Sequence, residues 1–171
     1  MSVDDFREEL LDSISVRLPP DAKEVDRAFA FVCEVGERLT QAEEFHDFIP
    51  SHFLGTGSRN RKPRVDGYEF DESDDSVRLV VAEFSGGLQP EVITRTRAEA
   101  IFSQLQTFLD DSLSKRIWNN VPEGMNDGLE LAGMLADKHP VVTRYRFFLI
   151  TDSSLSDRIK DLPQGDIDGR P

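Results

Sequence analysis

Residues 65–87 read VDGYEFDESDDSVRLVVAEFSGG, and this stretch predicts two strands joined by a polar turn. Side chains alternate in character from Val65 to Phe70, and a run rich in β-branched residues extends from Val77 to Phe84. Both patterns are typical of β-strands. The acidic and serine residues at 72–76 have the chemistry of a turn. The sequence therefore predicts an antiparallel hairpin, around which the rest of the chain is arranged.

Two carboxylates, Asp66 and Glu83, stand inside these otherwise apolar strands. Pairing across a four-residue loop at 73–76 places Asp66 directly opposite Glu83, and Phe70 opposite Leu79. Directly opposed side chains share a face of the sheet, with Cβ atoms about 4.5–5.5 Å apart. Two carboxylates at this distance repel each other, so a cation, a proton or solvent must lie between them. A slip of one residue would send Glu83 to the other face.

The acidic pair predicts a metal site, because Mg²⁺ prefers hard oxygen ligands and needs few protein groups. Glu83 and Ser85 are two residues apart, which is the spacing of the D…(D/E)-x-K signature of restriction-endonuclease-like nucleases. In that signature the acidic groups bind metal and the lysine polarises the attacking water. Asp66 and Glu83 are therefore the candidate catalytic and metal-binding residues. Ser85 replaces the lysine, which predicts a degenerate core. The alternative is that both carboxylates are simply solvated at a sheet edge.

A basic cluster lies immediately before Asp66 and consists of Arg59, Arg61, Lys62 and Arg64. Three of these, Arg61, Lys62 and Arg64, are candidates for positioning phosphate beside the metal. The alternative is a solvated loop that balances neighbouring acids. The formal net charge of −13 repels nucleic acid overall. Any nucleic-acid binding must therefore come from this patch or from a divalent ion.

The remaining metal-ligating and nucleophilic side chains predict no further site. His46, His52 and His139 do not form a ligand set, because a zinc site would need additional ligands from unspecified places. Cys33 lies among apolar residues of a helical segment and is predicted to be a core thiol. As the single cysteine, it excludes an internal disulfide and favours a reducing cytoplasm. The first ten residues lack signal-peptide character and no apolar run reaches about 18 residues, so a cytoplasmic protein without membrane contact is expected.

Apolar periodicity and capping residues predict four helices. These helices cover 3–18, 22–40, 96–114 and 127–138. Residues 43–63 read as a long connection, residues 153–160 as one or two helical turns, and the FFLI run at 147–150 as a strand buried on both faces.

The length of 171 residues predicts one domain, with a helical hairpin at 1–45 and an α/β core at 46–171. The predicted fold is α/β, a small mixed central sheet flanked by helices. The chain stops after Asp168-Gly169, where a further strand would begin. We therefore expect it to be the N-terminal fragment of a longer protein.

Three stretches together carry a family resemblance: VDGYEFDESDDSVRLVVAEF, TRAEAIFSQLQTFLDDSL and RYRFFLITDSSLSDRI. They resemble the N-terminal domain of abortive-infection phage-resistance (AIPR) proteins, bacterial proteins associated with defence against phage. The resemblance runs from the first helix to the chain end. It implies a larger C-terminal AIPR region as the partner of this domain. The nuclease-like signature carries over only to Asp66 and Glu83, and Arg95 and Arg97 are the nearest candidates to replace the missing lysine.

Two functions follow from these observations. The first is a non-catalytic or weakly active nuclease-like interaction module of a phage-defence protein, which docks a partner or the remainder of its own chain. The second is a Mg²⁺-dependent nuclease that hydrolyses phosphodiester bonds. The acidic composition and Ser85 at the lysine position favour the interaction module.

Overall fold

The computed structural model describes residues 2–57 and 61–160, and its centre is a four-stranded mixed sheet. The strands are β1 (Ile49–Leu54), β2 (Arg64–Asp71), β3 (Ser76–Glu83) and β5 (Arg144–Thr151), in the order β1-β2-β3-β5. The β1/β2 and β2/β3 pairs are antiparallel, and β3/β5 is parallel. The predicted mixed α/β architecture is therefore confirmed.

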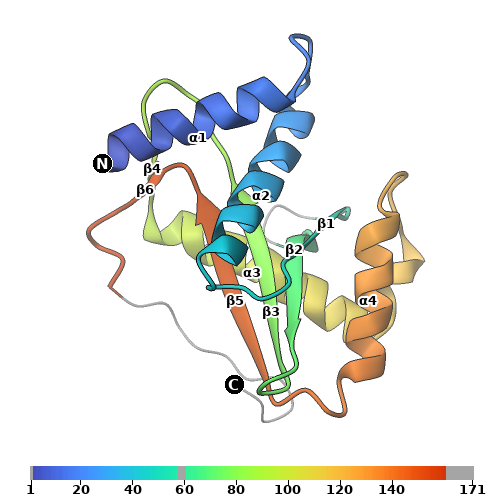
Figure 1. Cartoon of the computed structure of the whole chain (residues 1–171). Helices are drawn as coiled ribbons and strands as arrows, with labels where there is room; N and C mark the ends of the chain where they lie inside the picture. Colours follow the sequence, from blue (N-terminus) through green and yellow to red (C-terminus); the bar gives the residue numbers. More distant parts are fainter. Residues whose placement is uncertain (1, 58–60, 161–171) are drawn as a thin grey trace.

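Helices cover both faces of this sheet (Figure 1). One face carries α1 (Val3–Arg17) and α2 (Glu24–Gln41), which form the predicted helical hairpin. The other carries α3 (Arg95–Leu113) and α4 (Asn126–Lys138), joined through the short 3₁₀ helix η1 (Arg116–Asn119). Among the described residues, no helix combines the length and apolar character that a membrane span requires.

Alternation along the strands divides the apolar side chains between two cores. The larger core lies between the sheet and the α3/α4 side, where Leu79, Leu105 and Phe108 are fully buried. The smaller core lies between the sheet and the α1/α2 side, and in it Phe31 stacks on Phe84 with ring centroids 4.8 Å apart. The central hairpin is therefore buried on both faces.

In the hairpin, the pairing of β2 with β3 is shifted by two residues from the predicted register. Phe70 lies opposite Val77, whereas we expected it opposite Leu79. The turn occupies 72–75, where the Asp71 carboxylate accepts hydrogen bonds from the amide and hydroxyl of Ser73. A two-residue shift preserves the faces, so Asp66 and Glu83 stay on the same side of the sheet. They are diagonal neighbours, and the predicted direct opposition is wrong.

Three short elements differ from the sequence-based expectation. The edge strand β1 lies inside the predicted connection at 43–63, and its register is irregular between Pro50 and Phe53. A second, two-stranded sheet pairs β4 (Val92–Ile93) with β6 (Ser154–Leu155), so the helical turns expected at 153–160 are wrong. The FFLI run at 147–150 is half-buried, because β5 forms the other edge of the four-stranded sheet.

Candidate functional site

The Arg64 side chain lies between the two carboxylates that the sequence singled out. Its Nε is 3.0 Å from Asp66 Oδ2, and its Nη1 is 2.7 Å from Glu83 Oε1. Its Nη2 also donates to the Ala82 carbonyl. Of the cation, proton or solvent expected between the acidic side chains, the structure shows a cation, the guanidinium of Arg64 on the strand of Asp66.

Asp66 is buried, with 5% of the residue exposed, and contacts further donors. His52 Nδ1 on β1 lies 2.8 Å from Asp66 Oδ1, and the Ala82 amide donates to Oδ2 at 2.9 Å. A buried carboxylate is stable only when its charge is paired and its lone pairs are hydrogen-bonded. His52, Arg64 and the Ala82 amide together meet this requirement. Sequence reasoning missed His52, because β1 itself was not predicted.

Glu83 is held from the other side by the first turn of α3. Arg97 Nη2 lies 2.6 Å from Glu83 Oε2, and Thr94 caps the helix by accepting a hydrogen bond from the Arg97 amide. Arg95 instead forms an ion pair with Glu99 at 2.8 Å. Of the two arginines considered as replacements for the lysine, Arg97 therefore reaches the acidic pair.

Ser85, in the lysine position of the signature, is bound to Asp152. Its amide and hydroxyl donate to Asp152 Oδ1 and Oδ2 at 2.8 and 3.0 Å, and the Gly86 amide adds a third bond at 3.0 Å. Burial alone would raise the pKa of Asp152, but the hydrogen bonds from Ser85, Arg7 and Gly86 lower it overall. Ser85 thus donates hydrogen bonds to a structural carboxylate, Asp152, at the end of β5.

This arrangement does not fit a Mg²⁺ ion. Each of the four carboxylate oxygens of Asp66 and Glu83 already faces a donor of the chain, from His52, Arg64, Arg97 or the Ala82 amide. Mg²⁺ needs close oxygen ligands in octahedral geometry. An ion at this position would have to displace the Arg64 guanidinium. The metal-binding and catalytic roles of Asp66 and Glu83 therefore remain predictions that require Arg64 to move.

The predicted phosphate-binding residues are not equivalent in the structure. Arg64 is turned toward the carboxylates, whereas Arg61 is exposed and Lys62 is half-buried. Arg59 lies outside the described residues. A phosphate role stays a prediction for Arg61, Lys62 and Arg64, and for Arg64 it competes with the ion pairs described above.

A second guanidinium bridges two carboxylates on the opposite face of the same hairpin. Arg78 lies 3.0 Å from Glu69 Oε2 and 2.8 Å from Asp71 Oδ2. Glu69 Oε1 also accepts hydrogen bonds from the backbone amides of His46 and Asp47. Among the residues the structure describes, His46, Glu69 and Asp71 have ligand atoms within 4.8 Å of one another. Arg78 already supplies the positive charge for this group.

Comparison with known proteins identifies the family. The model of the abortive infection phage resistance protein N-terminal domain matches residues 31–171, which is more than half of the chain. The match begins within α2, so α1 lies outside it although we expected the resemblance to start at the first helix. No curated protein and no solved structure matched the chain. With its mixed α/β fold, the chain belongs to the family of abortive infection phage resistance protein N-terminal domains.

Proposed function

We propose that this chain is the interaction module at the N-terminus of a cytoplasmic bacterial phage-defence protein, built on a degenerate restriction-endonuclease-like core. One observation carries the proposal: the Arg64 guanidinium bridges Asp66 and Glu83. Its partner is another protein or the C-terminal AIPR region of the same longer protein.

The placement of the two carboxylates supports a nuclease-like core. Asp66 on β2 and Glu83 at the end of β3 share one face of the sheet, although they come from different strands. Both reach the same guanidinium within 3.0 Å. An ion of comparable charge would find oxygen ligands here only after that guanidinium left.

The partners of these carboxylates support a non-catalytic role. Metal-assisted hydrolysis needs an ion with an open position for water. Removing one partner of a buried ion pair costs about 3–5 kcal/mol. Displacement of Arg64 from buried Asp66 would carry a cost of this order, which a metal ion must repay before any chemistry begins.

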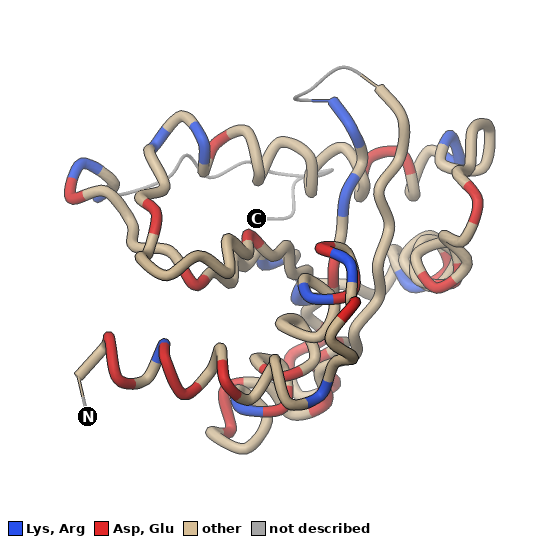
Figure 2. Tube along the Cα trace, turned by 90° about the horizontal axis from the view of Figure 1, so that it is seen from above, with Lys and Arg blue, Asp and Glu red and all other residues tan. Residues whose placement is uncertain are grey.

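The distribution of charge supports a protein partner over a nucleic acid. The net charge is −13, and acidic segments recur along α1 (Figure 2). Phosphate backbones are repelled by such a surface, because nucleic-acid affinity comes largely from Lys and Arg contacts. The Mg²⁺-dependent nuclease remains the second candidate, favoured by Arg97, a cation that is 47% exposed beside Glu83.

The test compares metal binding and cleavage in matched variants. We expect calorimetry with Mg²⁺ or Mn²⁺ to give the same small heats for the wild type and Asp66→Asn. We also expect no cleavage of plasmid or RNA in Mn²⁺ by the wild type or by Glu83→Gln. Glu123→Gln, an exposed carboxylate on the loop before α4, is the matched control. Cleavage by the wild type and Glu123→Gln that disappears in Glu83→Gln would overturn the proposal in favour of a nuclease.

A further inference from the structure

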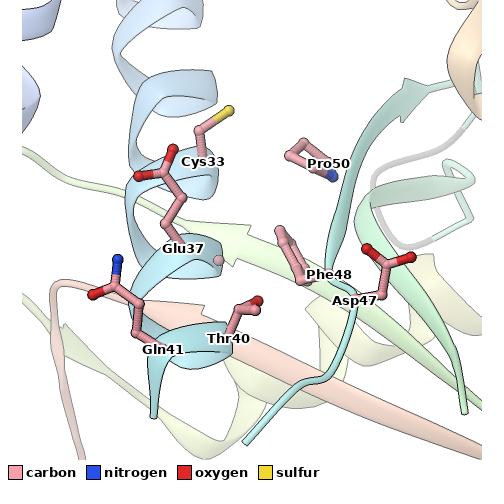
Figure 3. Close-up of a pocket in the computed structure, with 8 residues that line it drawn as sticks. Cys33, Glu37, Thr40, Gln41, Asp47, Phe48 and Pro50 are labelled. Atoms are coloured by element: carbon pink, nitrogen blue, oxygen red, sulfur yellow. The ribbon is translucent and has the colours of Figure 1, made fainter. Parts of the chain in front are cut away.

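A pocket of about 400 Å³ opens between α2 and residues 47–50, which lead into β1 and form its first residues (Figure 3). Its walls come from two parts of the chain that face each other across the opening. They are Cys33, Gly36, Glu37, Thr40 and Gln41 on α2, and Asp47, Phe48 and Pro50 on the opposite segment. We refer to this cavity as the α2 pocket.

Phe48 forms a rigid wall of the α2 pocket. Its ring lies between two glycines, Gly36 of α2 and Gly67 of β2. A Cβ atom at Gly36 would stand 2.1 Å from the ring, and one at Gly67 would stand 2.3 Å from it. Phe45 packs edge-on against Phe48 with centroids 5.5 Å apart. The ring is therefore held by backbone on both sides, and the pocket is preformed, as ligand sites usually are.

The α2 pocket is acidic. Its lining includes Glu37 and Asp47 but neither Lys nor Arg, and Glu43 and Glu44 are exposed on the adjoining turn. A hydrogen bond from Arg17 lowers the pKa of Glu37, so this side chain is ionised at neutral pH. The Arg17–Glu37 pair is about half exposed on both sides, and such pairs contribute little free energy. Glu37 can therefore exchange Arg17 for another cation at low cost.

Apolar surface extends from the pocket along α2. Phe29 and Val25 precede Cys33 by four and eight residues, so all three lie on one side of the helix. Phe29 is 47% exposed and Val25 is 69% exposed. Burial raises the pKa of the Cys33 thiol, and the charge of Glu37 raises it further. Cys33 is therefore a neutral, apolar part of this wall and not a nucleophile.

We infer that the α2 pocket docks a basic, amphipathic segment of a partner polypeptide by taking up one of its Arg or Lys side chains. The aliphatic stem of that side chain lies against Phe48 and Cys33, and its charged head reaches Glu37. The Asp47 carboxylate lies on the far side of Phe48 from α2 (Figure 3) and adds negative charge at the rim of the pocket. Apolar residues of the segment cover Phe29 and Val25. This inference rests on the proposed interaction function and specifies its site and its partner chemistry.

The probe is a fluorescein-labelled peptide of Leu-Ala-Arg-Lys repeats, with a peptide of Leu-Ala-Glu-Gln repeats as its acidic counterpart. Anisotropy titrations compare Glu37→Gln/Asp47→Asn with Glu123→Gln/Asp137→Asn, two exposed carboxylates near or on α4. Both double variants change the net charge equally. We expect the basic peptide to bind the control like the wild type, and the pocket variant about tenfold more weakly, as expected for a loss of about 1.4 kcal/mol. Equal weakening in both variants would overturn the inference, because it would indicate diffuse charge attraction.

Mapping amide chemical shifts of the wild type by NMR gives a second readout that does not depend on a variant. We expect the basic peptide to shift Gly36, Thr40 and Gln41, and the acidic peptide to leave them unchanged. Shifts confined to other elements, no binding at all, or a dimer of this chain that closes the pocket would each overturn the inference. The peptide titration and the cleavage assay are independent measurements, so failure of this docking site is distinguishable from failure of the proposed non-catalytic function.

Discussion

Arg7 of α1 and Asp152, 145 residues apart in the sequence, form a buried ion pair with Nη2 and Oδ2 2.8 Å apart. The exposed fractions of the two side chains are 11% and 0%. Arg7 also donates to the carbonyls of Asp152 and Gly87. This contact ties α1, which lies outside the family match, to the ends of the central strands.

We expect Arg7→Ala to lower the free energy of unfolding by about 3 kcal/mol, because it leaves the Asp152 charge buried and unpaired. Urea denaturation monitored by circular dichroism measures this change. The matched control is Arg146→Ala, which breaks a partly exposed pair with Asp74 and should cost about 1 kcal/mol or less. Equal losses of unfolding free energy in the two variants would contradict the prediction, because they would show that burial does not strengthen the Arg7–Asp152 pair.

The lowered pKa of Asp152 predicts a pH dependence of stability. A carboxyl whose pKa is lower in the folded state stabilises the protein above its unfolded pKa, about 3.9, and this contribution falls as the pH drops through the folded value. We therefore expect the wild type to lose stability between pH 5 and acidic pH more steeply than Asp152→Asn, which has no charge to lose. Urea midpoints across this range measure the difference. Parallel pH profiles would contradict the assignment.

Replacement of Arg64 should convert the acidic pair into a cation site. In Arg64→Ser the Asp66 and Glu83 carboxylates lose their shared partner, and we expect a lower unfolding temperature than in the wild type. Addition of Mg²⁺ or Mn²⁺ should raise that temperature in the variant, because ligands that bind the folded state stabilise it, and should leave the wild type unchanged. Thermal unfolding with and without the salts, with Ca²⁺ for comparison, measures the effect. A variant indifferent to all three ions would contradict it.

Gly36→Ala tests the wall of the α2 pocket. In a helix this change alone should stabilise by about 1 kcal/mol. Here the new Cβ would stand 2.1 Å from the Phe48 ring, and overpacking costs about 1–3 kcal/mol. We expect a net loss of stability in the wild-type background and a gain in the Phe48→Ala background. A double-mutant cycle by urea denaturation measures this coupling, and additive effects would contradict the close contact.

The raised pKa of Cys33 predicts slow thiol chemistry, because the thiolate is the reactive form. At neutral pH we expect maleimide to react with Cys33 more slowly than with free cysteine, and the rate to keep rising with pH beyond about 8.5, the ordinary thiol pKa. Glu37→Gln should accelerate the reaction modestly, and Glu123→Gln should not. A rate equal to that of free cysteine would contradict the apolar setting of the thiol.

Local patterns were sufficient for most elements of the fold. Apolar periodicity predicted the long helices within a few residues, and the two halves of the hairpin were clear from residues 65–84. The edge strand β1 was missed because Pro50, Ser51 and His52 interrupt its alternation. The register of the hairpin depends on where the turn lies, which strand patterns do not contain. In the structure the turn occupies 72–75, and the Asp71 carboxylate accepts hydrogen bonds from Ser73 there.

The sequence by itself predicted that Asp66 and Glu83 share a face and that a cation, a proton or solvent separates them. The shared face survives any register shift of an even number of residues, such as the two-residue shift observed here, and like charges on it repel each other. Only the tertiary structure decided that the group between them is a cation, and which cation it is. Arg64, Arg97 and His52 come from three different elements, and their meeting depends on how β1 and α3 pack against the sheet. Such long-range packing leaves no local trace in the order of residues.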